Sequence, residues 1–169
     1  MLITGGIRSG KSAYALKLTE NLSAPKIFLA TAEALDDSMI TRIKNHQEER
    51  GQTFQTIEEP LNIDETLQSL PENTSGVIID CMTLWVNNLL YKLEEDEQRI
   101  QEKISSFLKV LKNVSTQVYI VTNEVGLGII PENKMARRYI DLLGRLNQDI
   151  AEISDEVIFM VSGIAQKIK

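Results

Sequence analysis

The first twelve residues constrain the fold more than any other stretch of this 169-residue chain. A short apolar run, Leu2–Thr4, is followed at positions 5–12 by Gly-Gly-Ile-Arg-Ser-Gly-Lys-Ser, which fits the pattern Gly-x-x-x-x-Gly-Lys-Ser. Glycines let the backbone turn tightly and present N–H groups to phosphate oxygens, and a helix N-terminus also favours an anion. The pattern therefore predicts a phosphate-binding loop between a strand and a helix, rather than an ordinary glycine-rich turn.

Two residues at the end of this loop carry specific chemistry. The ammonium group of Lys11 can reach the β- and γ-phosphates of a nucleoside triphosphate, and the hydroxyl of Ser12 can occupy one coordination position on Mg²⁺.

Length, charge and cysteine content limit the remaining possibilities. A chain of 169 residues suits one domain with a sizeable core, and we expect a single nucleotide-binding domain over 1–169. The net charge of −6 gives no electrostatic reason to expect nucleic-acid binding. No apolar run approaches the roughly 20 residues of a membrane span. With Cys81 as the single cysteine, no internal disulfide can form. The chain enters a strand directly, so we expect no signal peptide and a cytoplasmic protein.

Strand and helix signals alternate along the chain. Nearly continuous apolar runs argue for a mostly parallel sheet covered by helices on both faces, an α/β fold of the P-loop NTPase (RecA-like) kind. The strands are expected at Leu2–Thr4, Lys26–Ala30, Thr53–Ile57, Val77–Asp80, Gln117–Thr122 and Glu156–Val161, with a further short one in the tail. The helices are expected at Lys11–Leu22, from the caps Asp36 and Asp37 to about Arg50, at Ile63–Leu70 with Asn62 as a cap, and at Thr83–Leu93, Gln98–Lys112 and Glu132–Ile153.

Ligands in such folds bind at the carboxyl ends of the strands, so the residues that follow each strand are candidates for the site. Asp80 ends the fourth apolar run in the manner of a Walker B acid, and its expected role is to hold Mg²⁺ beside Ser12. The alternative is an N-cap for the helix that begins near Thr83.

His46 is the only histidine of the chain. Arg42 and Arg50 lie four residues before and after it, so the three side chains share one face of the predicted helix. An imidazole between two guanidinium groups suits attack on a phosphorus centre. The alternative is a surface histidine on a very polar helix.

The stretch 122–133 is a long glycine-containing loop at the same edge, and Asn123 and Glu124 are candidates to face the site. Arg137, Arg138 and Arg145 follow on the next helix. They either hold phosphate or form ion pairs with Asp141, Asp149 or the acidic turn at 94–97. Cys81 is interpreted as a small packing residue, and Trp85 and Tyr91 are expected in the core.

Several of these segments together resemble one family, the bifunctional adenosylcobinamide kinase / adenosylcobinamide-phosphate guanylyltransferases of cobalamin biosynthesis. The resemblance covers nearly the full length. It is carried by the residues 4–12, Ala30-Thr31-Ala32, Leu35-Asp36-Asp37-x-Met39, Arg42-Ile43-x-x-His46, the stretch 122–133 and the ending 161–169. The stretch that begins Asn123-Glu124-Val125-Gly126 and the ending are far more specific than the phosphate loop. Where some relatives have two adjacent histidines, this chain has Asn45-His46, and the acidic turn at 94–97 is shorter than in some of them.

The resemblance implies two reactions. The family phosphorylates the aminopropanol hydroxyl of adenosylcobinamide with a nucleoside triphosphate, ATP or GTP, and then transfers GMP from GTP to that phosphate, releasing pyrophosphate. GMP passes through a covalent phosphoramidate on a histidine that corresponds to His46, with Lys11 stabilising the departing phosphates alongside Mg²⁺. Family members form homotrimers.

The resemblance also implies the nucleotide contacts. They correspond to Gly5, Gly6, Ile7, Arg8, Ser9, Gly10, Lys11, Ser12, Ala30, Thr31, Ala32, Gln47, Glu48, Glu49, Arg50, Glu58 and Asp80. For the base of the kinase step, Asp80 and Glu124 are both candidates. Two other functions are open on the residues alone: a P-loop kinase of another small molecule with His46 as a bystander, and a nucleotide-binding regulatory module.

Overall fold

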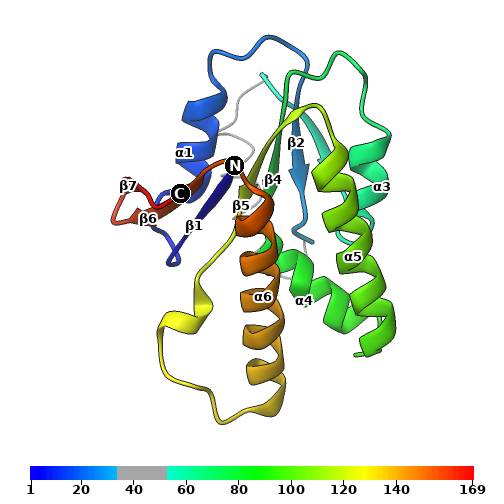
Figure 1. The fold of residues 1–169 in the computed structure, drawn as a ribbon, viewed down its shortest axis with the longest axis vertical. Coiled ribbons are helices and arrows are strands. Elements are labelled where there is room, and N and C mark those ends of the chain that lie inside the picture. Colours follow the sequence, from blue (N-terminus) through cyan, green and yellow to red (C-terminus); the bar gives the residue numbers. More distant parts are fainter. Residues whose placement is uncertain (34–52) are drawn as a thin grey trace.

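The computed structural model describes residues 1–33 and 53–169 (Figure 1). Its strands are β1 (Leu2–Gly5), β2 (Lys26–Ala30), β3 (Gln55–Glu58), β4 (Gly76–Asp80), β5 (Gln117–Val121), β6 (Val157–Val161) and β7 (Ile164–Lys167). Its helices are α1 (Lys11–Thr19), α3 (Ile63–Gln68), α4 (Met82–Lys92), α5 (Glu97–Asn113) and α6 (Lys134–Ile153), with a 3₁₀ turn η1 (Val125–Leu127). The expected elements outside 34–52 are thus confirmed, with ends shifted by up to three residues. The expected helix that carries His46 lies outside the described residues.

The strands form one sheet in the order β3-β2-β4-β5-β1-β6-β7. All neighbouring pairs are parallel except β6 and β7, which are antiparallel. Parallel pairing places the carboxyl ends of β1 to β6 along one edge of the sheet. The strand β5 lies between β1, which carries the glycine-rich loop, and β4, which ends in Asp80.

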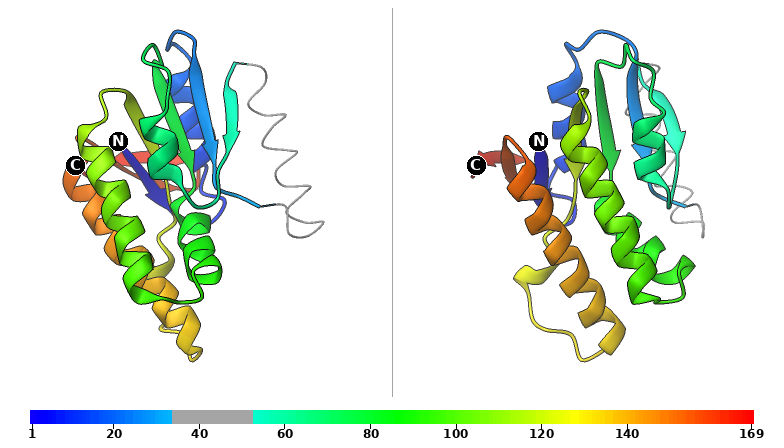
Figure 2. Two further views of the ribbon diagram at one scale, coloured as in Figure 1. Left: turned by 90° about the vertical axis from the view of Figure 1, so that its right-hand side faces the viewer. Right: turned by 45° about the vertical axis from the view of Figure 1, so that its right-hand side comes forward.

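Alternate residues of each strand enter two separate hydrophobic clusters, because successive side chains of a strand point to opposite faces. Leu2, Ile27, Leu29, Val77 and Ile79 pack with residues of α3, α4, α5 and α6. Ile3, Phe28, Ile78, Tyr119 and Val121 form the other cluster with Ala15 of α1. In Figure 2, α5 and α6 run side by side over the first face, and α1 lies behind the sheet. Helices therefore cover both faces, as the sequence predicts.

Two of the described helices, α5 and α6, begin at a residue whose side chain accepts a hydrogen bond from the first turn. The Asp96 carboxylate accepts a hydrogen bond from the Arg99 N–H (3.1 Å) and starts α5, and the Asn133 side chain accepts from the Ala136 N–H (3.0 Å) and starts α6. Asn62 precedes α3, but its side chain makes no capping hydrogen bond. Asn62 thus occupies the predicted cap position and its carbonyl accepts from the Thr66 N–H, while the Glu59 carboxylate accepts from the N–H groups of Leu61 and Asn62.

Two further expectations concern the helix α4. Trp85 is fully buried, and its indole N–H donates to the Leu61 carbonyl at 2.9 Å, which confirms it as a core residue. Tyr91 is 71% exposed, so its placement in the core is wrong. Six residues turn an α-helix by about one and two-thirds turns, so Tyr91 points away from the face that carries Trp85.

Within the described residues, no helix combines the length and the apolar character that a bilayer-spanning segment needs.

Candidate functional site

The glycine-rich loop links β1 to α1 at the carboxyl edge of the sheet (Figure 1). Gly5 has φ +146° and Gly10 has φ +95°, in the region that favours glycine, and Arg8 between them has φ 55°. Gly10 occupies the N-cap position of the nine-residue helix α1 and makes no side-chain capping hydrogen bond. The geometry is that of a backbone cradle for an anion.

Lys11 lies across this cradle. Its side-chain ammonium donates to the Gly6 carbonyl at 2.5 Å and lies 3.4 Å from the Ser9 hydroxyl, and the residue is only 7% exposed. The loop backbone, through the Gly6 carbonyl, thus holds the positive charge of Lys11 beside the N–H groups that would contact the phosphates. The predicted role of Lys11, contact with the β- and γ-phosphates, stays a prediction.

The turn between β6 and β7 contacts the glycine-rich loop. The sequence did not predict this contact. The Gly163 N–H donates to the Ser9 carbonyl at 3.0 Å, and a Cβ on Gly10 would lie 3.3 Å from the Gly163 Cα. A Cβ on Gly5 would lie 2.3 Å from the Met160 carbonyl oxygen of β6. The C-terminal segment therefore packs directly against the phosphate loop. The ending 161–169 contributes only to the family resemblance, and nothing in it identified this contact.

Three of the predicted contact residues lie in register on neighbouring strands. Ala30 of β2 pairs with Glu58 of β3 on one side and with Asp80 of β4 on the other, so all three strands end at the same level of the sheet. Asp80 is not the N-cap of α4, because the cap position is Cys81. That alternative for Asp80 is wrong.

Thr31 connects two of these strand ends. Its hydroxyl donates to the Cys81 carbonyl (2.7 Å) and accepts from the Cys81 N–H (2.8 Å). Its carbonyl accepts from the buried Asn88 side chain of α4 at 2.8 Å, and the same amide donates to the Pro60 carbonyl at 3.0 Å. Thr31 and Asn88 thus hold the ends of β2, β3 and β4 together around Asp80. The sequence offered no pattern that identifies Asn88.

A second polar cluster lies where β5 ends. Thr122, Asn123 and Glu124 follow that strand, and Asn147 of α6 contacts all three residues. Nearby, the Asn123 N–H donates to the Thr83 hydroxyl, and the Tyr139 hydroxyl donates to the Thr83 carbonyl at 3.1 Å. Burial raises the pKa of Tyr139, and the negative charge of Cys81 in its thiolate form would raise it further.

The expected magnesium ligands fit a hard cation. Among the described residues, neither the Ser12 hydroxyl nor the Asp80 carboxylate makes a hydrogen bond or ion pair, so both oxygens are available to a ligand. Oxygen donors are the ones that Mg²⁺ prefers. The part of the chain that the structure describes contains no group of three or more His, Cys, Asp or Glu side chains gathered as a metal site. Among the described residues, Ser12 and Asp80 are thus the two predicted ligands that a metal could use together with phosphate oxygens.

The three arginines near the long loop differ in their contacts. Arg138 pairs with Glu95 and Glu97, both at 2.7 Å, which confirms the ion-pair alternative for this residue. Arg137 donates to the carbonyls of Pro131 and Glu132. Arg145 makes no ion pair within the described ranges and lines a cavity beside Glu124.

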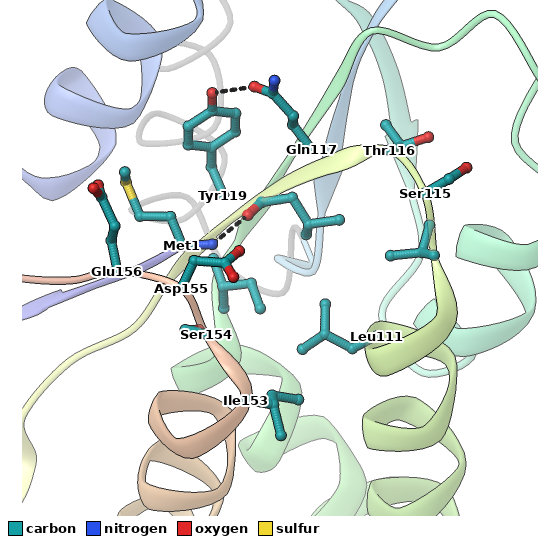
Figure 3. Close-up of a pocket in the computed structure, with 13 residues that line it drawn as sticks. Met1, Leu111, Ser115, Thr116, Gln117, Tyr119, Ile153, Ser154, Asp155 and Glu156 are labelled. Carbon is teal, nitrogen blue, oxygen red and sulfur yellow. Dashed lines mark hydrogen bonds between the residues drawn. The ribbon is translucent and has the colours of Figure 1, made fainter. Parts of the chain in front are cut away.

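A cavity of about 470 Å³ lies away from all predicted site residues (Figure 3). It is lined by Met1, Gln117, Tyr119 and the segment 153–156, at the amino ends of the strands. In this cavity the Tyr119 hydroxyl donates to the Gln117 side chain at 2.8 Å. Because nucleotides bind at the carboxyl ends in such sheets, this cavity is not the nucleotide site.

Of the other predicted site residues, Arg42, His46, Gln47, Glu48, Glu49 and Arg50 lie outside the described residues.

Comparison with known proteins gives a consistent result. Residues 1–168 match the family model described as cobinamide kinase / cobinamide phosphate guanyltransferase. The chain is 37% identical to the bifunctional adenosylcobalamin biosynthesis protein CobU of Escherichia coli, over 100% of this chain and 99% of that protein. It is 39% identical to the bifunctional adenosylcobalamin biosynthesis protein CobP of Pseudomonas aeruginosa, over 99% of this chain and 96% of that protein.

A solved structure, the KaiC-like protein of Pyrococcus horikoshii, is similar in fold. It has a TM-score of 0.51 and 18% identity, covering 94% of this chain and 68% of that one. This likeness supports the RecA-like α/β fold that the sequence predicts.

Proposed function

The chain belongs to the cobinamide kinase / cobinamide phosphate guanyltransferase family, and from this premise we propose that one nucleotide site at the phosphate loop serves both reactions. The observation that carries the proposal is the placement of Lys11 across a cradle that begins at Gly5, with Asp80 two strands away at the same edge of the sheet. A triphosphate held there presents its phosphates along the row of strand ends.

In the kinase reaction, the loop N–H groups and Lys11 bind the β- and γ-phosphates of ATP or GTP. The hydroxyl oxygen of adenosylcobinamide attacks the γ-phosphorus, and the nucleoside diphosphate leaves with the electron pair of the broken P–O bond. Mg²⁺, held by Ser12 and Asp80, would neutralise charge on the phosphates. Lys11 stabilises the charge that develops on the leaving group.

In the transferase reaction, a neutral His46 nitrogen attacks the α-phosphorus of GTP. A P–N bond forms, the bond to the β-phosphate breaks, and pyrophosphate leaves. The phosphate of the acceptor then attacks the guanylyl group, releasing His46 and forming adenosylcobinamide-GDP. Gly5 to Ser12, Ala30 to Ala32, Gln47 to Arg50, Glu58 and Asp80 contact the guanine nucleotide in this proposal.

We also propose that residues 1–169 act as one domain within a cytoplasmic homotrimer, with no nucleic-acid partner. The continuous seven-stranded sheet, to which segments from both ends of the chain contribute, supports the single domain.

Incubation with GTP labelled at the α-phosphate tests the mechanism. The expected result is labelled protein whose label is acid-labile and alkali-stable, as a phosphoramidate is, and which is lost in His46→Ala but kept in Asn45→Ala. Equal labelling of wild type and His46→Ala, or labelling of neither, would overturn the histidine route.

The same experiment with γ-labelled nucleotide separates the two other functions. A kinase of another molecule would leave adenosylcobinamide unlabelled, and a regulatory module would bind nucleotide without transferring either phosphate. Transfer of γ-label to adenosylcobinamide, followed by transfer of α-label to its phosphate, is the outcome that the proposal requires.

A further inference from the structure

The end of β5 occupies a central position in the candidate site. Because β5 lies between β1 and β4, its carboxyl end lies between the phosphate loop and Asp80. In a triphosphate bound with its β- and γ-phosphates on the loop, we expect the terminal phosphorus to face this position, because ligands of such sheets lie over the carboxyl ends of neighbouring strands. The side chains that follow β5 are therefore the ones placed to meet a group that attacks it.

Glu124 is the ionisable residue at this position, and three contacts hold it in place. Its Oε1 accepts hydrogen bonds from the Thr4 hydroxyl (2.8 Å) and the Asn147 side-chain amide (3.2 Å). Its backbone N–H donates to the carbonyl of Gly5, the first residue of the phosphate loop, at 3.2 Å. Glu124 is thus attached to both the loop strand and α6.

Asn147 is itself fixed, so this attachment is rigid. It is 6% exposed, its Oδ1 accepts from the buried Thr122 hydroxyl at 2.8 Å, and its amide also donates to the Asn123 carbonyl at 3.1 Å. A buried polar network in which each member is hydrogen-bonded holds its side chains in one arrangement.

The second carboxylate oxygen has a different environment. Within residues 1–33 and 53–169, Glu124 Oε2 makes no hydrogen bond or ion pair. Glu124 lines a cavity of about 550 Å³ between η1 and α6, together with Gly126, Ile140, Gly144 and Arg145. One oxygen of the carboxylate is therefore held by the protein, whereas the other makes no hydrogen bond among the described residues and belongs to a side chain that lines this cavity.

We propose that Glu124 is the catalytic base of the kinase reaction and that the alcohol-bearing arm of the acceptor enters the cavity between η1 and α6. As the hydroxyl oxygen forms its bond to the γ-phosphorus, its proton passes to Glu124 Oε2, and the bond to the β-phosphate oxygen breaks with its electron pair leaving on the nucleoside diphosphate. Thr4 and Asn147 are positioning residues that aim the carboxylate. This inference rests on the proposed function and assigns a role that the transferase reaction does not need, because a phosphate acceptor is already ionised.

The variant Glu124→Gln separates this role from a structural one. Glutamine keeps an oxygen that can accept from Thr4 and Asn147, so the network is retained, but the amide cannot take a proton. The expected result is a fall in kcat for phosphorylation of adenosylcobinamide by about 10²- to 10⁴-fold, the range for removal of a general base. The KM for nucleotide and the transfer of GMP to pre-phosphorylated acceptor stay within a few-fold of wild type.

Two further variants complete the test. Glu124→Asp keeps the carboxylate but withdraws it by one methylene, and it is expected to retain more kinase activity than Glu124→Gln. Glu152→Gln makes the same chemical change at an exposed position of α6 and serves as the matched control, with both activities unchanged.

The outcomes are distinguishable. Wild-type kinase activity in Glu124→Gln, or a parallel fall in both activities in folded protein, would overturn the role of Glu124 and leave the proposed function intact. A wild-type protein that neither phosphorylates adenosylcobinamide nor forms a guanylyl enzyme would overturn the proposed function and this inference with it.

Discussion

The hydroxyl of Thr31 exchanges two hydrogen bonds with the backbone of Cys81, donating to its carbonyl at 2.7 Å and accepting from its N–H at 2.8 Å. Thr31 follows β2 and Cys81 follows β4, so this fully buried hydroxyl fixes the strand end that carries Asp80. Only a side chain with both a donor and an acceptor can satisfy the two backbone groups at once.

Thr31→Val should therefore destabilise the protein and disturb the site together. Valine has nearly the same shape but can make neither hydrogen bond to Cys81. The Cys81 carbonyl still accepts from the Trp85 N–H (3.1 Å), so the expected loss of about 1–3 kcal/mol comes mainly from the bond that the Cys81 N–H donates to the Thr31 hydroxyl. Urea denaturation measures the loss, and titration with nucleotide and Mg²⁺ should show weaker binding. Thr56→Val, at an exposed position of β3, is the control and should change neither quantity.

The glycines at the start of the phosphate loop should differ sharply in their tolerance of alanine. At Gly5 a Cβ would lie 2.3 Å from the Met160 carbonyl oxygen, and φ is +146°. We expect Gly5→Ala to lower the free energy of unfolding by about 2–4 kcal/mol. At Gly6 a Cβ would meet nothing within 4 Å, so Gly6→Ala should stay within about 0.5 kcal/mol of wild type. Similar losses in the two variants would contradict this explanation.

Because Arg138 forms surface ion pairs, its replacement by alanine should have a small effect on stability and none on activity. Because its partners Glu95 and Glu97 lie at the surface, Arg138→Ala should cost at most about 1 kcal/mol, and less at high salt. Kinase and transferase rates should remain at the wild-type level. A large fall in either rate would show that Arg138 holds phosphate after all.

The raised pKa of Tyr139 leads us to expect that the protein loses stability at alkaline pH. Burial raises the pKa of this phenol, and its hydroxyl donates to the Thr83 carbonyl. The unfolded chain loses the proton as pH rises through about 10, whereas the folded protein retains it, so ionisation favours the unfolded state. The free energy of unfolding should thus be unaffected by this group at neutral pH and fall with increasing pH above about 10.

Tyr139→Phe should reduce that alkaline slope, measured by urea denaturation at a series of pH values. Burial also raises the pKa of Tyr119, so the slope should shrink without vanishing. Equal slopes for wild type and Tyr139→Phe would show that another group causes the alkaline loss.

The sequence was sufficient for the order and type of the described elements, because apolar strands, amphipathic helices and their caps are local patterns. The sequence predicted less reliably which side chains of a helix face the core and at which residue a helix ends. Tyr91 lies in an apolar helix, yet its angular position places it at the surface. The helix α1 ends at Thr19 rather than at Leu22, and the Lys26 ammonium donates to the carbonyls of Thr19 and Glu20 at that end.

For the site, the sequence by itself determined the phosphate loop, Lys11, the acid at the end of the fourth strand and the family. These features depend on residue types at fixed spacing, since backbone turns and phosphate contacts require particular side chains at particular positions. Only the tertiary structure decided what surrounds them. The strand order places Glu124 between Gly5 and Asp80, Thr31 meets Cys81 across fifty residues, and Gly163 contacts the phosphate loop from the far end of the chain. Such contacts depend on how strands pair and helices pack, and no local pattern in the chain specifies them.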